Sequence, residues 1–419
     1  MNESIKKRIE AVRRGEVPEG YITENHQLRP MEWRYEKIGK YLEAYDEFSN
    51  DTGAYPLATS SRQGLMLQSE YYNDQRYEET TGGFHVVPEG YVTYRHMSDD
   101  DIFRFNVNRM GTPVLVSPEY PVFTISDGLC QDLLIAYLNN MKEFTAYCSA
   151  QKKGSTRTRM YFSRLGEFVM PIPPVSEQKK IAEILATCDR VIELKQQLLE
   201  EKRRQKQWQM QKLLSETSGV NEVKLSTLCS TVCDGDWIES KDQSESGIRL
   251  IQTGNVGVGR YLDKEGHARF ISEGTFKRLN CTEVFAGDIL LSRLPDPIGR
   301  ACMVPDLYTR AITAVDCTIL RFKDVDVAEF FLQYATSNEY FNKISILAGG
   351  STRTRISRKE IEKLLIPVPP SKTAMQKISK GLSLADQEIS ALEQELAAWQ
   401  QKKKALMQLL LTGLVRVNA

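Results

Sequence analysis

Several features that mark common protein classes are missing from this chain. Its 419 residues include no apolar run of the roughly 18 residues that a membrane-spanning helix needs. Residues 1–14 contain no apolar stretch, so we expect no secretory signal there. The 55 Lys+Arg residues balance the 55 Asp+Glu residues, which excludes a histone-like basic protein and a strongly acidic one. Clustered charge still permits DNA contact. We expect a cytoplasmic protein of several globular domains.

Metal-binding and catalytic motifs are also missing. The eight cysteines form no CxxC pair, and the four histidines do not fall at zinc spacing beside them. No GxxxxGK[ST] loop is present to bind a nucleotide. The glycine-rich residues 254–259 favour a hairpin turn over a dinucleotide loop. The acidic run at 99–101 is more typical of a solvated loop than of a metal site. We expect no metal, no cofactor and no catalytic residue on this chain.

An internal repeat is the strongest positive signal. Residues 154–159 and 350–355 both read GSTRTR, and the proline motifs PIPP (171–174) and PVPP (367–370) recur at the same shift of 196 positions. Beyond the prolines the two copies stay similar at a shift of 197, because the second copy has one extra residue. This repeat is too long, and occurs too few times, for a solenoid. It predicts two copies of a globular domain, each followed by a helix.

The two predicted helices are long. Residues 177–216 contain neither Pro nor Gly, residues 373–411 contain one Gly, and both place apolar residues three and four positions apart. About 40 residues make a helix of about 60 Å, so each helix is the obvious partner of the other in a coiled coil. The alternative is two separate helices, each packed on its own domain. The residues expected in a shared apolar seam are Ile181, Ile192, Leu199, Leu213, Ile378, Ile389, Leu396 and Leu410.

The globular parts are predicted to be α/β (α+β) with mixed sheets. Short apolar segments at 287–292, 301–304 and 317–322 indicate strands, and residues 327–338 indicate a helix. In the first copy, residues 90–95 take the place of the strand at 287–292, and residues 132–139 take the place of the helix. We therefore expect two domains that share their order of elements and differ in sequence before GSTRTR.

Positive charge gathers at matching positions of the two copies. No acidic residue lies between 151 and 166 or between 340 and 359, which suits contact with DNA phosphate, one segment per domain. The alternative is that the repeated arginines hold their own loop through hydrogen bonds and Arg–carboxylate pairs. The expected phosphate contacts are Lys152, Lys153, Arg157, Arg159, Arg353 and Arg355.

Base-reading residues are expected elsewhere. A residue that is kept in both copies cannot distinguish two different DNA sequences, so readers belong in the unmatched loops. Arginine commonly reads guanine, and asparagine or glutamine reads adenine. The candidates are Arg62, Gln63, Arg95, Gln252, Asn255 and Arg293.

These motifs resemble the specificity (S) subunit of Type I restriction–modification systems, over nearly the whole chain. GSTRTR is followed by MPIPPVSEQKKIAEIL (170–185) and by IPVPPSKTAMQKI (366–378). The helix endings MQKLL (210–214) and MQLLL (407–411) and the domain entry MEWRYEKIG (31–39) also match. One departure is visible, because Ser176-Glu177-Gln178 of the first copy is replaced by Thr373-Ala374-Met375-Gln376 in the second.

The resemblance implies a domain plan in which the two long helices pair as an antiparallel coiled coil between two target recognition domains. It comprises an N-terminal helical extension (1–30), target recognition domain 1 (31–174), helical region 1 (175–219), target recognition domain 2 (220–370) and helical region 2 (371–419).

The resemblance also implies a function. Such a subunit is non-catalytic, binds double-stranded DNA at a bipartite target, and directs two methyltransferase (M) subunits and restriction (R) subunits to it. S-adenosylmethionine and ATP/Mg are then expected on the partners. Three alternatives stay open: an S-like subunit of a methylation-only system, a fused restriction–modification enzyme, and a coiled-coil scaffold without a DNA role. The missing motifs argue against the enzyme, and the duplicated domains are unexplained by the scaffold.

Overall fold

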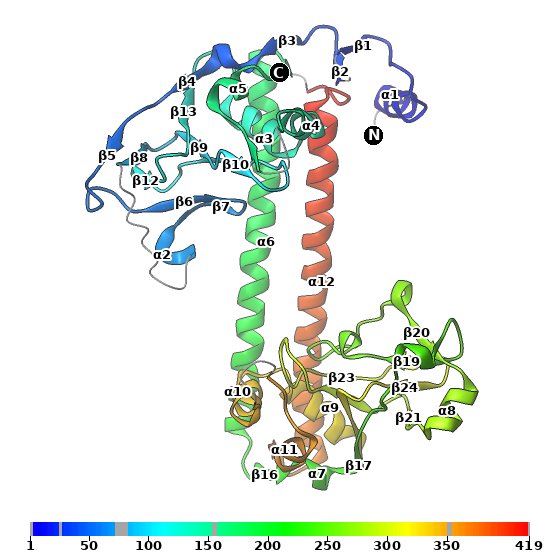
Figure 1. Ribbon diagram of the computed structural model, residues 1–419. Coiled ribbons are helices and arrows are strands. Elements are labelled where there is room, and N and C mark those ends of the chain that lie inside the picture. Colours follow the sequence, from blue (N-terminus) through cyan, green and yellow to red (C-terminus); the bar gives the residue numbers. More distant parts are fainter. Residues whose placement is uncertain (1–2, 25–26, 72–82, 153–156, 350–353, 418–419) are drawn as a thin grey trace. The chain divides into compact units, whose positions relative to one another are not determined.

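The computed structural model describes residues 3–24, 27–71, 83–152, 157–349 and 354–417. The chain forms two compact units (Figure 1). Unit 1 is built from residues of 1–194 and 397–419, and unit 2 from residues 195–396. Each unit therefore contains one globular domain together with a part of both long helices.

The two long helices are α6 (Val175–Glu216) and α12 (Lys372–Leu411), of 42 and 40 residues. The prolines before each helix cannot continue a helical hydrogen-bond ladder and so limit where it begins. Near the start of α12 the hydroxyl of Ser371 accepts the backbone N–H of Ala374 at 3.2 Å. Gly381 is exposed, and α12 runs through it without a break. Both predicted helices are confirmed, within two residues at each end.

Ion pairs show that α6 and α12 run antiparallel in each unit. In unit 2, Lys195 pairs with Glu395 at 2.5 Å and Lys202 pairs with Glu388 at 2.7 Å, so numbers rise on one helix as they fall on the other. In unit 1, Asp189 of α6 pairs with Lys403 of α12. The expected antiparallel pairing is therefore confirmed.

The ends of these helices also complete the domain cores. Ile181 and Leu410 lie in the core of unit 1, and Ile378 lies in the core of unit 2 with Leu213 packed against it. Of the remaining expected seam residues, Leu199 is buried, and the half-buried ones are Ile192, Ile389 and Leu396. We had expected the two helices either to pair with each other or to pack on separate domains. The structure shows both, because the helices pair and their end turns also pack on a domain core.

Unit 1 has a central antiparallel sheet with the strand order β11-β9-β13-β4 and a smaller sheet with the order β12-β8-β5. The remaining strands form the pairs β1–β2, β3–β15, β6–β7 and β10–β14. Apart from the long helices, its elements are α1 (Glu3–Arg13), β1 (Tyr21–Glu24), β2 (Gln27–Pro30), β3 (Arg34–Lys37), η1 (Ile38–Tyr41), β4 (Leu42–Ala44), β5 (Phe48–Ser49), β6 (Ala58–Ser61), β7 (Gly64–Leu67), α2 (Gln68–Tyr71), β8 (Phe84–Val87), β9 (Val92–Tyr94), β10 (Met97–Ser98), β11 (Phe105–Val107), β12 (Val114–Val116), β13 (Val122–Ile125), α3 (Gln131–Asn140), α4 (Lys142–Ala150), β14 (Thr158–Arg159), α5 (Phe162–Gly166) and β15 (Val169–Ile172).

Unit 2 has a four-stranded sheet with the order β17-β25-β22-β23 and a five-stranded sheet with the order β18-β20-β19-β24-β21. The second sheet is mixed, because β19 and β24 pair in parallel. Apart from the long helices, the elements of this unit are β16 (Asn221–Lys224), α7 (Leu225–Leu228), β17 (Cys229–Asp234), η2 (Ser240–Asp242), β18 (Gln243–Ser244), β19 (Ile248–Ile251), η3 (Thr253–Asn255), η4 (Glu265–His267), β20 (Arg269–Ile271), α8 (Glu273–Leu279), β21 (Glu283–Val284), β22 (Ile289–Ser292), β23 (Ala301–Met303), β24 (Ala311–Thr313), β25 (Cys317–Phe322), α9 (Val325–Tyr334), α10 (Asn338–Leu347), α11 (Arg358–Lys363) and β26 (Leu365–Val368).

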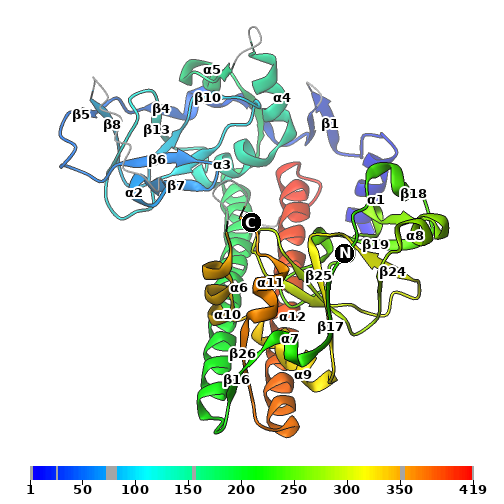
Figure 2. The same cartoon turned by 60° about the horizontal axis from the view of Figure 1, so that its bottom comes forward.

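The four-stranded sheet of unit 2 is covered on both faces. Successive strand residues point to opposite faces, and along β22 the side chains of Ile289 and Leu291 join one core while Leu290 joins another. The first core includes helices α9, α10 and α11 and the ends of α6 and α12. Figure 2 shows α10 and α11 beside these two long helices. A strand that is buried on both faces reads as a continuous apolar run, as residues 289–291 do.

The duplication seen in the sequence is also present in the fold. The sheet order β4-β13-β9-β11 of unit 1 matches β17-β25-β22-β23 of unit 2, and each sheet is followed by three helices, α3-α4-α5 or α9-α10-α11. The predicted equivalence of residues 90–95 and 287–292 is confirmed, because β9 and β22 occupy the same place in the two sheets. The N-terminal segment departs from a purely helical extension, since α1 is followed by the β1–β2 hairpin.

Candidate nucleic-acid interface

The end of the GSTRTR motif is fastened to the sheet in the same way in both units. In unit 1 the backbone N–H of Met160 donates to the carbonyl of His96 at 2.8 Å, and in unit 2 that of Ile356 donates to the carbonyl of Arg293 at 3.3 Å. Met160 and Ile356 both have 0% exposure. The residue that follows the repeated motif is therefore buried in the core of each unit. Lys153 and Arg353, two of the expected phosphate contacts, lie outside the described residues.

In unit 1 the basic residues near the motif meet acids from a distant segment. Arg157 Nε lies 2.7 Å from an oxygen of Asp99, and Lys152 Nζ lies 3.7 Å from Asp101. Arg62 Nη2 lies 2.6 Å from Asp100. The hydrogen bond from Arg62 lowers the pKa of Asp100. The acidic run at 99–101 is therefore not simply a solvated loop, which corrects our interpretation.

In unit 2, two arginines near the motif are also paired with acidic residues. Arg355 Nη2 lies 2.7 Å from Asp316, with almost half of the Arg355 side chain exposed. Arg293 is only 6% exposed. Its guanidinium donates to the carbonyl of Val315 at 2.5 Å and lies 3.2 Å from the carboxylate of Asp234. These contacts give Arg293 a structural role in unit 2, and the base-reading role that the sequence suggested stays a prediction.

Asn255 is a second expected base reader with a structural role. It is 6% exposed; its side-chain oxygen accepts the backbone N–H of Gln252 at 3.0 Å, and its amide donates to the carbonyl of Leu262 at 2.9 Å. These bonds close a turn that the bridge between Val256 and Tyr261 continues. The glycine-rich segment is thus a hairpin turn, as predicted. Gln252 is half-buried at the start of this turn, whereas Arg62, Gln63 and Arg95 are exposed.

Sequence reasoning named Arg159 and Arg95 but missed two aromatic side chains beside them in unit 1, those of Tyr161 and His96. Arg159 Nη1 lies 3.5 Å from the hydroxyl of Tyr161, whose side chain is half exposed. The rings of Tyr161 and His96 stack with their centroids 6.1 Å apart. Burial lowers the pKa of His96, and the charges of Arg159 and Arg95 act in the same direction, against Glu119. An aromatic residue two positions after the motif, absent from the second copy, was the available signal.

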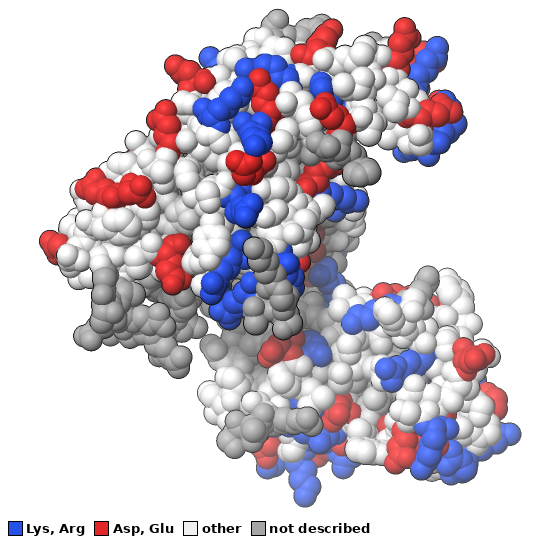
Figure 3. Space-filling model, turned by 45° about the horizontal axis from the view of Figure 1, so that its top comes forward, with Lys and Arg blue, Asp and Glu red and all other residues white. Residues whose placement is uncertain are grey.

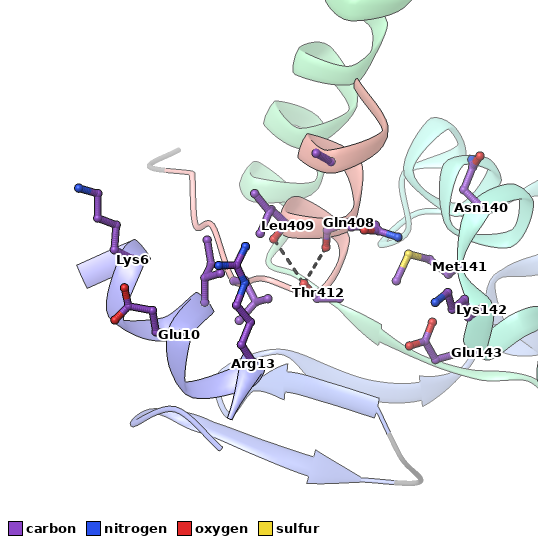
Figure 4. A pocket seen from close by; sticks show the side chains of 13 residues that line it. Lys6, Glu10, Arg13, Asn140, Met141, Lys142, Glu143, Gln408, Leu409 and Thr412 are labelled. Atoms are coloured by element: carbon purple, nitrogen blue, oxygen red, sulfur yellow. Dashed lines mark hydrogen bonds between the residues drawn. The ribbon is translucent and has the colours of Figure 1, made fainter. Parts of the chain in front are cut away.

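A cavity of about 560 Å³ lies in unit 1 between α1, the start of α4 and the last turns of α12 (Figure 4). Its charged lining is mixed, with Lys6, Arg13 and Lys142 beside Glu10 and Glu143. None of the residues predicted to contact DNA lines it. This cavity is therefore distinct from the basic residues around the GSTRTR motif.

Charges of both signs lie on the face of the molecule that Figure 3 draws. Figure 3 shows basic and acidic side chains side by side, in keeping with the equal numbers of Lys+Arg and Asp+Glu. Within the described ranges, no group of three or more His, Cys, Asp or Glu residues could hold a metal ion. In the same residues, no helix is long and apolar enough to cross a membrane.

Comparison with known proteins identifies the family. Residues 84–202 and 218–398 match the family described as Type I restriction modification DNA specificity domain. The chain is 26% identical over 425 aligned residues to the Type I restriction enzyme MjaVIII specificity subunit of Methanocaldococcus jannaschii, covering 94% of this chain and 96% of that one. It is 28% identical to the putative MjaX specificity subunit of the same organism, over 68% of each chain.

Solved structures show the same fold. The S subunit of a Type I restriction–modification system from M. genitalium matches with a TM-score of 0.55 at 15% identity, covering 90% of this chain and 96% of that one. A chain from a study of assembly and conformational transition of the type I R-M system matches with a TM-score of 0.54 at 16% identity, covering 92% and 99%. Since the family match includes both repeats and more than half of the residues, the chain belongs to the Type I restriction modification DNA specificity domain family.

Proposed function

We propose that this chain is the non-catalytic, sequence-specific DNA-binding subunit of a Type I restriction–modification complex. It recognises a bipartite target in double-stranded DNA, with each unit reading one half. The observation that carries the proposal is the repeated framework of sheet, three helices and long helix, matched by the family in both copies. The sequences around this framework differ between the copies, as expected of two domains that bind different sequences in equivalent ways.

The partners follow from the same proposal. Two methyltransferase subunits bind this chain through the long helices and the flanks of the domains, and restriction subunits join the full complex. S-adenosylmethionine and ATP/Mg are then bound by those partners, and this chain contributes only the recognition of the DNA sequence. The relatives named above support this division, because they are specificity subunits of restriction enzymes. We further propose that the complex acts in the cytoplasm, where the DNA is.

An exchange of segments tests the proposal. Residues 31–150 are replaced with the corresponding segment of a relative of different specificity, and the chain is expressed together with the methyltransferase subunit of its own system. Genome-wide mapping of methylated bases should show a change in one half of the target only. The matched exchange of residues 222–349 should change the other half. A change of both halves in either exchange, or of neither, would contradict a modular bipartite reader.

A further inference from the structure

Two arginines beside the GSTRTR motif of unit 1 are exposed and have no acidic partner among the described residues. They are Arg95, just after β9, and Arg159, the last residue of β14. Their neighbours Arg62 and Arg157 are each held by a carboxylate within 2.7 Å. Two guanidinium groups without counter-charge repel each other across a short distance. Such a pair is stabilised by an anion placed between them.

The chain brings these two arginines to one place. Strand β14 pairs with β10, so that Arg159 lies opposite Met97, two residues from Arg95. The charges of Arg95 and Arg159 both act on the ring of His96, which lies between Arg95 and Met97 in the chain. The hydroxyl of Tyr161 lies 3.5 Å from Arg159 Nη1. Arg95 and Arg159 are therefore near neighbours in unit 1, on the two sides of His96, and the phenolic hydroxyl of Tyr161 lies beside Arg159.

Unit 2 does not repeat this arrangement. Arg355 occupies the position of Arg159 and is paired with Asp316. Arg293 occupies the position of His96, and it is buried against Asp234. Ser357 replaces Tyr161, and its hydroxyl accepts a backbone N–H as the N-cap of α11. The fold that the two units share therefore does not require an arginine without an acidic partner at these positions. In unit 1 such an arginine is available to bind a separate molecule.

We propose that Arg95 and Arg159 together bind one backbone phosphate of DNA, with the hydroxyl of Tyr161 donating to the same phosphate. This inference rests on the proposed function and specifies one contact within it. Arginine presents a planar fork of N–H donors that suits phosphate oxygens. Tyrosine hydroxyls also donate to DNA phosphates, and such contacts set the position of a protein on the duplex without reading its sequence.

The salt dependence of DNA binding tests the shared phosphate. A fluorescein-labelled 30-base-pair duplex of random sequence is titrated with the full chain, alone and with its methyltransferase partners, between 50 and 200 mM KCl. In the double variant Arg95→Gln/Arg159→Gln, the slope of log affinity against log salt should shrink by about 0.9, the value for one phosphate. Across this fourfold change in salt, that corresponds to a difference of about three- to fourfold. A decrease of about 1.8 indicates two separate phosphates and overturns the shared site.

Matched variants separate charge from folding. Arg109→Gln removes an equally exposed arginine of the same unit, one that is paired with Asp132 at 2.6 Å, and it should leave the slope unchanged. The double variant with lysine at both positions keeps the charge and should keep the slope, whereas Tyr161→Phe should weaken binding without altering it. All variants should melt within a few degrees of the wild type.

The outcomes also separate this inference from the proposed function. If the wild-type chain binds the duplex with a clear salt dependence and the double glutamine variant behaves identically, the phosphate site is wrong and the proposed function stands. If neither the chain nor its complex binds DNA, the proposed function itself is contradicted.

Discussion

At the scale of single residues, one arginine of each motif copy has a partner that the flanking sequence does not contain. Arg157 is paired with Asp99, which lies 58 positions away along the chain, and Arg355 is paired with Asp316. The Arg157–Asp99 pair is largely exposed and the Arg355–Asp316 pair is partly exposed. Exposed ion pairs contribute about 0–1 kcal/mol to stability. Loss of an arginine that pairs internally lowers the free energy of unfolding, whereas loss of an arginine that contacts phosphate lowers the salt dependence of DNA binding. The two roles can therefore be measured separately.

We expect Arg157→Gln and Arg355→Gln to act on the loops and not on DNA. Each variant should lower the free energy of unfolding by less than about 1 kcal/mol and leave the slope of log affinity against log salt unchanged. Chemical denaturation and the random-sequence duplex titration measure the two quantities. A slope reduced by about one would instead show that these arginines exchange their carboxylates for phosphate when DNA binds.

The contacts of Glu177 explain why the two copies of the repeat differ in sequence near the starts of α6 and α12. Glu177, near the start of α6, is 4% exposed at its side chain and accepts two bonds from Arg416, at 2.8 and 2.9 Å. It also accepts the indole N–H of Trp33 at 3.1 Å. In unit 1 this carboxylate holds the segment after α12. In unit 2 the corresponding segment after α6 continues directly into β16, so Thr373 and Ala374 can stand near the start of α12.

We expect Arg416→Ala to destabilise unit 1 by about 3 kcal/mol, because it leaves the buried carboxylate of Glu177 without its counter-ion. Adding Glu177→Gln in the same chain should recover part of the loss, since an amide can still accept from Trp33. Chemical denaturation of the single and double variants measures this coupling. Arg190→Ala, which breaks an exposed pair with Glu193, is the control and should have little effect. Equal losses for Arg416→Ala and Arg190→Ala would show that burial does not strengthen the pair.

At the scale of elements, the two long helices carry a reciprocal pair of charges. Asp189 of α6 pairs with Lys403 of α12, and Lys206 of α6 pairs with Asp386 of α12 at 2.6 Å. The two pairs are related by the 197-residue shift of the repeat. Their surroundings differ, because the side chain of Lys206 is 7% exposed and that of Lys403 is 26% exposed. Lys206 also donates to the hydroxyl of Thr336 at 3.2 Å, which ties α6 to the segment before α10.

The two pairs therefore form a matched experiment. Asp386→Ala strands a buried ammonium group and should cost about 2–3 kcal/mol, whereas Asp189→Ala releases a more exposed lysine and should cost less than about 1 kcal/mol. Urea denaturation followed by circular dichroism gives both values. Equal costs would show that the burial of Lys206 does not govern the strength of its pair.

The elements were more predictable than the site. Proline positions and apolar spacing suffice to predict α6 and α12, because both signals are local in the sequence. The strand β9 was predicted because its segment holds the same place in the first repeat as β22 holds in the second. The partners of Arg157 and the burial of Asn255 depend on chain segments that come together only after folding. In the sequence, a polar residue of a loop looks the same whether its side chain faces DNA or closes a turn, so the internal contacts of Asn255 and Arg293 could not be predicted.

At the scale of the whole molecule, unit 1 is built from two separate stretches of chain, whereas unit 2 is one continuous stretch that begins and ends inside a long helix. The core of unit 1 includes Met407, Leu410 and Leu411 of α12 beside Ile181 and Leu185 of α6. The core of unit 2 includes Met210 of α6 beside Ile378 and Leu382 of α12. Each globular domain thus depends on the helix of the other repeat, and the duplicated halves of the sequence are not the physical halves of the fold.

This exchange of helices has a consequence for synthesis on the ribosome. Domains usually fold as they emerge, the N-terminal one first. Here the sheet of unit 1 emerges early, but the residues of α12 that close its core are made only after every residue of unit 2. Unit 2 has all of its residues once Leu396 has been translated. Of the two units, the one that is begun first is therefore completed second, and its apolar face stays uncovered until the end of α12 has been made.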